Sequence, residues 1–251
     1  MRGLEILWQD PTLIAINKPS GLLVHRSEID RHETRNALQL LRDQVGRRVY
    51  PVHRLDKPTS GVLIFTFDAD MAREMGDVFT QRRVEKTYLA ITRGILPDHC
   101  RIDYPLRETL DRYTDSKADP DKAPQTALTR IQRLSAHEVS APAGRYRTAR
   151  FSVARINPET GRKHQIRRHL KHIFHPIVGD TTHGDGAQNQ FFRAHFGVSR
   201  LMLHAHTLTF THPGSGDRIE ITATLPRDIQ DVIDLMPPFI RDGTQAPEPP
   251  S

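Results

Sequence analysis

The feature that most constrains the fold is a run of seven residues, 61–67 (GVLIFTF), in which nearly every side chain is apolar, β-branched or aromatic. This composition is typical of a strand buried in a protein core. Further strand patterns flank a turn at residues 9–11 and occur at residues 49–52, 85–93, 126–133, 148–156, 202–210 and 218–224. We therefore expect residues 61–67 to form a rigid core strand within a sheet.

Four helices are predicted among these strands. Residues 36–45 have apolar side chains at helical spacing, and Gly46 can end that helix. Asp68 is expected to cap a second helix that reaches about residue 81, and two more patterns cover residues 164–173 and 227–235. Because strands and helices mix without a regular strand–helix–strand alternation, the pattern predicts an α+β fold with a mainly antiparallel sheet.

The organisation of the chain is predicted to be simple. No break in composition marks a linker and no internal repeat is evident, so we expect one domain over residues 1–241. Residues 242–251 are rich in Pro, Gln and Glu and are predicted to form a disordered tail. Residues 108–124 are charged and turn-rich, which predicts a mobile loop, and residues 185–197 are expected to form a second loop.

Charge and cysteine content restrict the partners and the compartment. Lys and Arg number 36 against 30 Asp and Glu, and a basic protein suits a polyanion such as RNA or DNA, although a basic surface without that role is also open. Cys100 is the only cysteine, which excludes an internal disulfide and a multi-cysteine zinc site. The sequence shows no secretory signal pattern and no run approaching 18 apolar residues, so a cytoplasmic protein is expected.

Residues 53–61 (HRLDKPTSG) form the most informative segment. Asp56 stands between Arg54 and Lys57 on a predicted turn, directly before the core strand. Nearby cations favour the ionised form of a carboxylate, so this is a suitable place to present one charged carboxylate. Asp, Pro, Thr, Ser and Gly are also ordinary turn residues, and on residue types alone a plain surface turn is the more common outcome.

Two other segments can carry chemistry. Residues 160–170 (TGRKHQIRRHL) place several cations at a turn and at the start of a predicted helix, an arrangement that favours phosphate. A solvated basic helix face is the ordinary alternative. Residues 85–90 (EKTYLA) put Tyr88 on a strand, where it faces either a cleft or the core.

Taken together, these segments resemble the RluA family of pseudouridine synthases. HRLDKPTSG is similar to the signature of that family, and EKTYLA and TGRKHQIRRHL are similar to its two other active-site segments, in the same order. HPIVGDTTHGD and RLMLHA also match, so the resemblance runs from about Leu4 to Leu225. It implies the pseudouridine synthase fold, with a central, mostly antiparallel mixed sheet, a long active-site cleft, and flanking helices and loops, as a single catalytic domain.

The resemblance also implies roles for individual residues. Asp56 matches the catalytic aspartate, Tyr88 the tyrosine that stacks on the target uracil and helps to remove its C5 proton, and Arg167 the arginine that pairs with the aspartate. Arg54 matches the arginine that fills the gap left by the flipped base. His183 departs from the family, because many members have tyrosine at this place.

The implied reaction is the isomerisation of uridine in RNA to pseudouridine. The C1′–N1 bond breaks, the uracil turns and C1′ joins C5, so no electrons are transferred and no cofactor is expected. The carboxylate could attack C1′, take the C2′ proton or stabilise the detached sugar. The details of the segments are most similar to family members that act on uridine 65 in the T-stem of tRNA, which makes tRNA the expected substrate. Another tRNA or rRNA site is the alternative.

Two other classes of function stay open from the sequence. One is an RNA-binding protein that keeps the fold without chemistry. The other is a nucleoside hydrolase, which usually needs two cooperating carboxylates, and no second acidic residue is evident near the three segments. A monomer is expected because the sequence shows no exposed heptad or apolar patch.

The fourteen histidines raise the question of a metal site. His169, His172 and His175 could lie near one another, and His204 and His206 share one face of a predicted strand. However, no HExxH motif or Cys/His spacing of a zinc site occurs. No metal is therefore expected, and several histidines are predicted to face RNA or to complete hydrogen bonds in the core.

Overall fold

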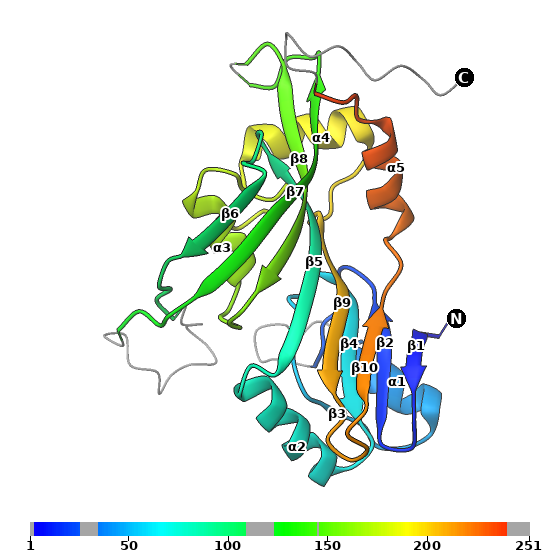
Figure 1. Ribbon diagram of the computed structural model, residues 1–251. Coiled ribbons are helices and arrows are strands. Elements are labelled where there is room, and N and C mark those ends of the chain that lie inside the picture. The colour runs from blue at the N-terminus through cyan, green and yellow to red at the C-terminus, as the bar shows by residue number, and fades with distance from the viewer. Residues whose placement is uncertain (1–2, 26–34, 109–122, 145, 240–251) are drawn as a thin grey trace, which may run out of the picture.

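The fold is described from a computed structural model of the chain, over residues 3–25, 35–108, 123–144 and 146–239. Ten strands form one mixed sheet: β1 (Glu5–Gln9), β2 (Leu13–Lys18), β3 (Tyr50–Pro51), β4 (Ser60–Thr66), β5 (Val84–Arg93), β6 (His99–Asp103), β7 (Leu128–Val139), β8 (Ala149–Pro158), β9 (Leu203–Thr211) and β10 (Arg218–Thr222). The main path is β1-β2-β4-β9-β5-β8-β7-β6, with β10 on β9 and β3 on β4 (Figure 1). Only β4 and β9 pair in parallel within the described part of the sheet. The predicted α+β fold with a mostly antiparallel mixed sheet is confirmed.

Helices cover both faces of the N-terminal half of the sheet. The helices of the described residues are α1 (Ala37–Val45), α2 (Ala69–Thr80), α3 (Gln165–His172), α4 (Gly186–Phe196) and α5 (Arg227–Leu235). Side chains alternate across a strand, so neighbouring residues of β4 face different helices. Ile64 packs in the same buried cluster as Met75 of α2, whereas Phe65 packs with Leu41 of α1. This two-sided cover explains why the predicted core strand is apolar along its whole length.

The two helices of this half end where the sequence predicts. The Asn36 side chain accepts a hydrogen bond from the N–H of Gln39 at 3.0 Å, and Gly46 ends α1 in the left-handed conformation. The Asp68 side chain caps α2 by accepting from the N–H of Met71 at 2.7 Å. Each cap satisfies a backbone group that the helix leaves without an internal partner.

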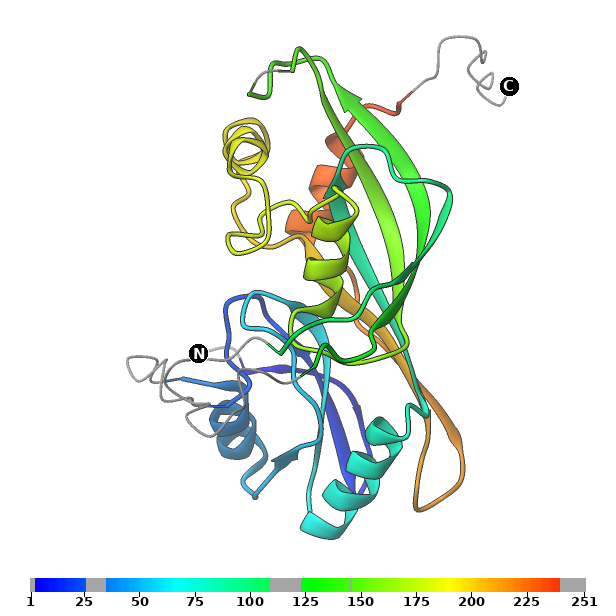
Figure 2. The same ribbon diagram turned by 90° about the vertical axis from the view of Figure 1, so that its left-hand side faces the viewer.

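The C-terminal half of the sheet is longer and carries the other three helices. Figure 2 shows α3 and α4 on the same side of β7 and β8. Leu170 of α3, Phe192 of α4 and Val232 of α5 are buried in one cluster with Phe151 of β8. Packing against this cluster fixes α3, and with it the segment that the resemblance assigns to the active site.

One sequence prediction needs correction, and two others fall mostly or wholly outside the described residues. The predicted loop at residues 185–197 is wrong, because these residues form α4 with its flanking caps: the Asp185 side chain accepts from the N–H of Gln188 at 3.1 Å and Gly197 is left-handed. Strand β6 was not predicted. Most of the predicted loop at residues 108–124 and all of the predicted tail at residues 242–251 lie outside the described residues.

Gly61 carries the close approach of the two halves of the sheet, and we predict that Gly61→Ala destabilises the fold. Its φ is +115°, and an added Cβ would stand 2.1 Å from the carbonyl oxygen of Ala205 on β9. We expect the free energy of unfolding in urea to fall by about 2–3 kcal/mol, from backbone strain and displacement of β9. Gly76→Ala is the control, because that glycine lies in α2 with open space around it. Equal stability of the two variants would contradict the prediction.

Candidate active site

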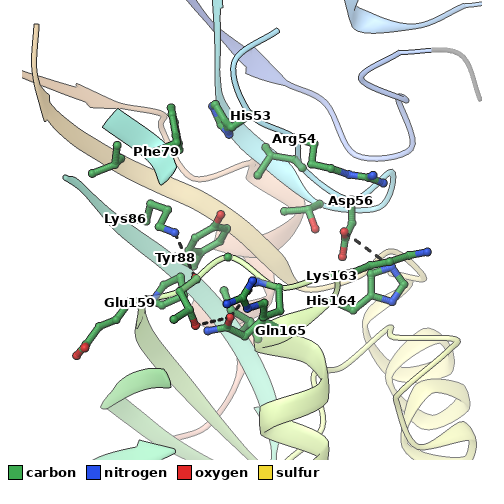
Figure 3. Close-up of a pocket in the computed structure, with 18 of the residues that line it drawn as sticks. His53, Arg54, Asp56, Phe79, Lys86, Tyr88, Glu159, Lys163, His164 and Gln165 are labelled. Carbon is green, nitrogen blue, oxygen red and sulfur yellow. Dashed lines mark hydrogen bonds and ion pairs between the residues drawn. The ribbon is translucent and has the colours of Figure 1, made fainter. Parts of the chain in front are cut away.

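A pocket of about 670 Å³ opens where the two halves of the sheet meet. Its walls come from three separate stretches of chain, residues 53–59, 79–88 and 158–167, together with Leu203 of β9. Figure 3 shows Asp56 and His164 at one end of the pocket, Phe79 and Lys86 at the other, and Tyr88 between them. All three segments singled out in the sequence therefore contribute to one pocket.

Asp56 lies on the turn that leads into β4. Its carbonyl oxygen accepts from the N–H of Thr59 at 3.0 Å, which closes the turn. The side chain is 20% exposed, and Oδ2 accepts a hydrogen bond from Nη1 of Arg167 at 3.0 Å. Oδ1 lies 3.8 Å from Nε2 of His164. The turn thus presents one carboxylate at the wall of the pocket, with a guanidinium against one oxygen.

Arg167 is buried and bridges two carboxylates. It is only 4% exposed, and besides Asp56 it binds Asp180 through two hydrogen bonds, Nε to Oδ2 at 2.7 Å and Nη2 to Oδ1 at 2.8 Å. Burial opposes the charged form, but the two carboxylates outweigh burial and raise the pKa of Arg167. The bidentate pair holds the guanidinium in one orientation, in which Nη1 points at Asp56.

Asp180 is the acidic residue that sequence analysis missed. It follows β8 and α3 in a segment used only for the family resemblance, and its Oδ1 also accepts from the N–H groups of Thr182 and His183 at 2.9 Å. Burial acts to raise the pKa of Asp180, but Arg167 and these N–H groups together lower it. The statement that no second acidic residue stands near the segments is therefore wrong. The Asp180 side chain is 1% exposed and is paired with Arg167, so it orients the guanidinium and does not line the pocket.

Tyr88 and Arg54 complete the set of residues that the sequence singles out. Tyr88 lies on β5 and lines the pocket together with Lys86, and the irregularity in the β5–β9 pairing beside it places the extra residue, His206, on β9. Burial, and then the charge of Asp56, raise the pKa of Tyr88, so its phenol is neutral near pH 7. Arg54 lines the same pocket and is exposed. The structure thus brings Asp56, Tyr88, Arg167 and Arg54 to one place.

Comparison with known proteins agrees with this geometry. The model of the RNA pseudouridylate synthase family matches residues 12–172. The chain belongs to this family. Proteins called tRNA pseudouridine synthase C from Pasteurella multocida and Haemophilus influenzae are 52% and 50% identical to it, each over 92% of this chain and 96% of the relative. A solved structure, Human RNA Pseudouridylate Synthase Domain Containing 1, is 25% identical with a TM-score of 0.70, covering 94% of this chain and 89% of that chain.

The chain is therefore a pseudouridine synthase, an isomerase, and it has the fold of that family. A buried lysine at the end of β2 bears on how Asp56 is held in this synthase. Lys18 is fully buried, and its ammonium donates to the carbonyl oxygens of Pro19, Leu22 and Lys57 at 2.7–3.1 Å. Burial lowers the pKa of Lys18 to about 7. This lysine ties the end of β2 to the turn that carries Asp56. A lysine is usually read as a surface residue, so sequence analysis did not select it.

The turn before α3 is ordered by Gln165. Its Oε1 accepts from Thr160 Oγ1 at 2.6 Å and from the N–H of Arg162 at 3.0 Å, and its Nε2 donates to the carbonyl oxygen of Leu128 at 3.0 Å. These bonds bring the flanking cations Arg162 and Lys163 to the pocket wall. The prediction of cations at the start of this helix is correct in part, because Arg167 turns inward and is neutralised by carboxylates.

His164 and His183 form a contact beside Asp56. Nδ1 of His164 lies 3.0 Å from Nε2 of His183, and His164 has a positive φ of 54° at the start of α3. Burial lowers the pKa of His164, and burial lowers that of His183 to about 4, so the pair is largely neutral near pH 7. His183, which stands where many family members have tyrosine, therefore contacts His164, and His164 in turn lies beside Asp56.

The other histidines raised by the sequence have structural partners. His169 makes hydrogen bonds with Thr129 Oγ1 and with the carbonyl oxygen of Tyr104, and His204 contacts Ser60 Oγ at 2.9 Å. Over the described ranges, no group of three His, Cys, Asp or Glu side chains could hold a metal ion. Likewise, none of the helices in those ranges is long and apolar enough to cross a membrane.

Proposed function

We propose that this synthase converts a uridine of tRNA, at position 65 in the T-stem, to pseudouridine, with Asp56 as the catalytic carboxylate and without a cofactor. The observation that carries the proposal is the ion pair between Asp56 and the buried Arg167 in a pocket that also contains Tyr88. The names of the relatives support tRNA as the substrate. The similarity of the sequence segments to family members with that target supports position 65.

The target nucleotide must leave the helix before its glycosidic bond can reach Asp56. Flipping a base out costs a few kcal/mol, and contacts of the basic surface with phosphates offset that cost. In our proposal Arg54, exposed at the pocket wall, fills the space that the base vacates. The uracil then lies against Tyr88, and stacking on such a ring contributes about 1–3 kcal/mol per base.

Asp56 then assists cleavage of the C1′–N1 bond, as nucleophile at C1′, as acceptor of the C2′ proton or as a charge that stabilises the detached sugar. Arg167 keeps the carboxylate in place for any of these routes, because its own orientation is fixed by Asp180. After the uracil turns, C5 bonds to C1′ and loses its proton, while N1 gains one. Atoms and electrons balance within the nucleotide and water.

Tyr88→Phe is expected to keep the stacking surface and to slow the loss of the C5 proton. The raised pKa leaves the phenol protonated, so Tyr88 can only relay a proton, accepting one as it passes its own to a neighbour. We expect kcat to fall by about 10²-fold with KM nearly unchanged, which steady-state tritium release from 5-tritiated uridine would measure. Tyr88→Leu should also raise KM. Unchanged product formation in Tyr88→Phe would remove this role.

The proposed reaction is tested with the purified wild-type enzyme and a tRNA transcript labelled with 5-tritiated uridine. Tritium release together with pseudouridine mapped at position 65 is the expected result. A transcript with cytidine at position 65, and a matching change across the stem, is the control and should release no tritium. Unchanged RNA would indicate a binding protein, free uracil would indicate a hydrolase, and product at another position would overturn the choice of site.

The proposal includes a cytoplasmic monomer acting as one catalytic domain. Size-exclusion chromatography with light scattering of the purified chain should give a mass close to 28.6 kDa. A mass twice as large would contradict the monomer without affecting the proposed chemistry.

A further inference from the structure

The pocket continues beyond the part that the proposed chemistry uses. Past Tyr88 it reaches Lys86 and Phe79, which lie away from Asp56 (Figure 3), and His53 and Arg82 also line the pocket. None of these four residues has a part in bond cleavage or base rotation as proposed above. This end of the pocket is lined by a different set of side chains, and their chemistry differs from that around Asp56.

Lys86 points into the pocket from the same face of β5 as Tyr88. The two residues are separated by one position, which places them on one face of the strand about 6.6 Å apart along it. Asn157 anchors this part of β5, since its Nδ2 donates to the carbonyl oxygen of Lys86 at 3.0 Å and to Thr87 Oγ1 at 2.9 Å. The backbone below the ammonium is therefore fixed.

The ammonium of Lys86 lacks an anionic partner within the part of the chain that the structure describes. Its one hydrogen bond is to the carbonyl oxygen of Thr160, at 3.3 Å, although an ammonium has three N–H donors. Glu159 lines the pocket as well, but its carboxylate pairs with Arg130 at 2.5 Å and points away in Figure 3. Half-buried Lys86 thus has unused donors.

Arg82 places a second positive charge in the same space. It stands at the turn between α2 and β5 with a positive φ of 58°, which is unusual for an arginine. Burial, and then the charge of Arg82, lower the pKa of Lys86 to about 8. Two cations that lie in the same part of a cavity repel each other, and an anion between them would relieve that repulsion.

The wall beside these cations is neutral and aromatic. His53 accepts from the N–H of Ile64 at 3.1 Å, and burial together with the charge of Lys86 lowers its pKa to about 3, so it carries no charge. Its ring stacks on Phe79 with 4.7 Å between centroids. A neutral aromatic wall beside two cations suits a nucleotide, which has both a flat base and a phosphate.

We propose that Lys86 and Arg82 form a binding site for a backbone phosphate of the RNA next to the flipped uridine. The inference rests on the proposed function, because it requires an RNA substrate. One nucleotide of an extended RNA chain is long enough to place its base at Tyr88 and its phosphate at Lys86, given their spacing along β5. The site would hold the RNA backbone in place while the uracil detaches and turns. It would bind the phosphate by charge and would not distinguish one base from another.

The site is tested by the salt dependence of tRNA binding in the Asp56→Asn background, in which the RNA is not turned over. Each phosphate contact contributes about 0.7–0.9 to the slope of log Kd against log salt concentration. Lys86→Gln and Arg82→Gln should each weaken binding about tenfold at low salt and reduce this slope by about that amount. Lys86→Arg should restore both. Arg155→Gln is the control, because Arg155 is exposed on the opposite face of the sheet and should change neither.

The pH dependence provides a second measurement. The charged form of Lys86 binds phosphate, so phosphate raises its pKa above the value of about 8 in the free enzyme. Wild-type affinity should therefore decline as pH rises from 7 to 9, because the ammonium of the free enzyme is lost in that range. In Lys86→Gln this decline in affinity should be absent. In Lys86→Arg it should also be absent between pH 7 and 9, because a guanidinium stays charged in that range.

The outcomes separate this site from the proposed reaction. If Lys86→Gln keeps the wild-type slope while wild-type enzyme still isomerises uridine, the phosphate site is wrong and the reaction stands. If the slope falls in Lys86→Gln but wild-type enzyme makes no pseudouridine, the site stands and the reaction is wrong. Thermal melting of each variant shows whether weaker binding comes from misfolding. If Lys86→Arg is folded but does not restore the salt-dependence slope, the phosphate site is also wrong.

Discussion

Asp56→Asn should abolish tritium release from 5-tritiated uridine in tRNA while folding and tRNA binding stay close to wild type. Asparagine has almost the shape of aspartate, but it carries no charge and cannot act as nucleophile or as proton acceptor. All three routes open to the carboxylate therefore fail together. We expect kcat to fall by about 10⁴-fold or more, at the upper end of what one positioned acid–base or nucleophilic group supplies.

The stability of Asp56→Asn should change little, because the buried guanidinium of Arg167 keeps its ion pair with Asp180. Arg167 retains both hydrogen bonds to Asp180, and the amide oxygen of the new asparagine can still accept from Nη1. Asp56 is partly exposed, so solvent screening reduces the contribution of its ion pair to stability, to roughly 1 kcal/mol or less. Urea denaturation and filter binding of labelled tRNA check these two expectations.

A matched control makes the loss specific to the site. Asp43→Asn makes the same chemical change at a carboxylate that is 65% exposed at the surface of α1 and pairs with Arg42. It should keep full turnover. Substantial residual turnover in Asp56→Asn, or an equal loss in Asp43→Asn, would mean that Asp56 does not have the assigned role.

The elements of the fold could be predicted where local chemistry decides the structure. Gly46 ends α1 and Asp68 caps α2 as predicted, because a glycine can adopt the left-handed conformation after a helix and a short polar side chain can accept from the first free N–H groups. The strand at residues 61–67 was recognisable since both of its faces are buried. By contrast, α4 has a capping aspartate and a terminal glycine, but Phe192 is its one fully buried apolar side chain and Phe191 and Phe196 are only partly buried, so its apolar spacing is a weak helix signal.

The candidate site was predictable only in part from residue types. The four residues Asp56, Tyr88, Arg167 and Arg54 came from a family resemblance, and physical reasoning alone favoured a surface turn for the first of them. Asp180 lies 13 residues from Arg167 along the chain, and nothing local marks it as the partner of a buried guanidinium. Contacts of this kind are set by how α3 packs on the sheet, which no short segment encodes.

Arg167→Met tests the buried charge network and is expected to affect both stability and activity. Methionine fills a similar volume without a charge, so Asp180 is left buried without its cation. Breaking a buried ion pair by removing one partner typically costs about 3–5 kcal/mol. We expect a loss of that size in urea denaturation at pH 7, and a loss of turnover of about 10²-fold or more because Asp56 is no longer held.

Arg167→Lys should not rescue the enzyme. The guanidinium reaches two carboxylates with three N–H groups in a fixed plane, whereas an ammonium is a single point charge on a flexible chain. Adding Asp180→Asn to Arg167→Met removes the unpaired buried charge, so the double variant should regain much of the lost stability. It should not regain turnover, because Asp56 still lacks its guanidinium. Recovery of turnover in the double variant would contradict a positioning role for Arg167.

The pH dependence of stability should reverse in Arg167→Met. In wild type the pKa of Asp180 lies below its ordinary value of 3.8, so its stabilising effect is present above that value and is lost as pH falls through the lower folded-state pKa. Without Arg167, burial dominates and raises the pKa of Asp180 above 3.8. The protonated form is then favoured in the fold, so the stability of the variant should increase as pH falls from 7 toward 5. Comparing urea denaturation at the two pH values gives the sign directly, and a wild-type-like dependence would mean that Asp180 does not depend on Arg167 for its charge.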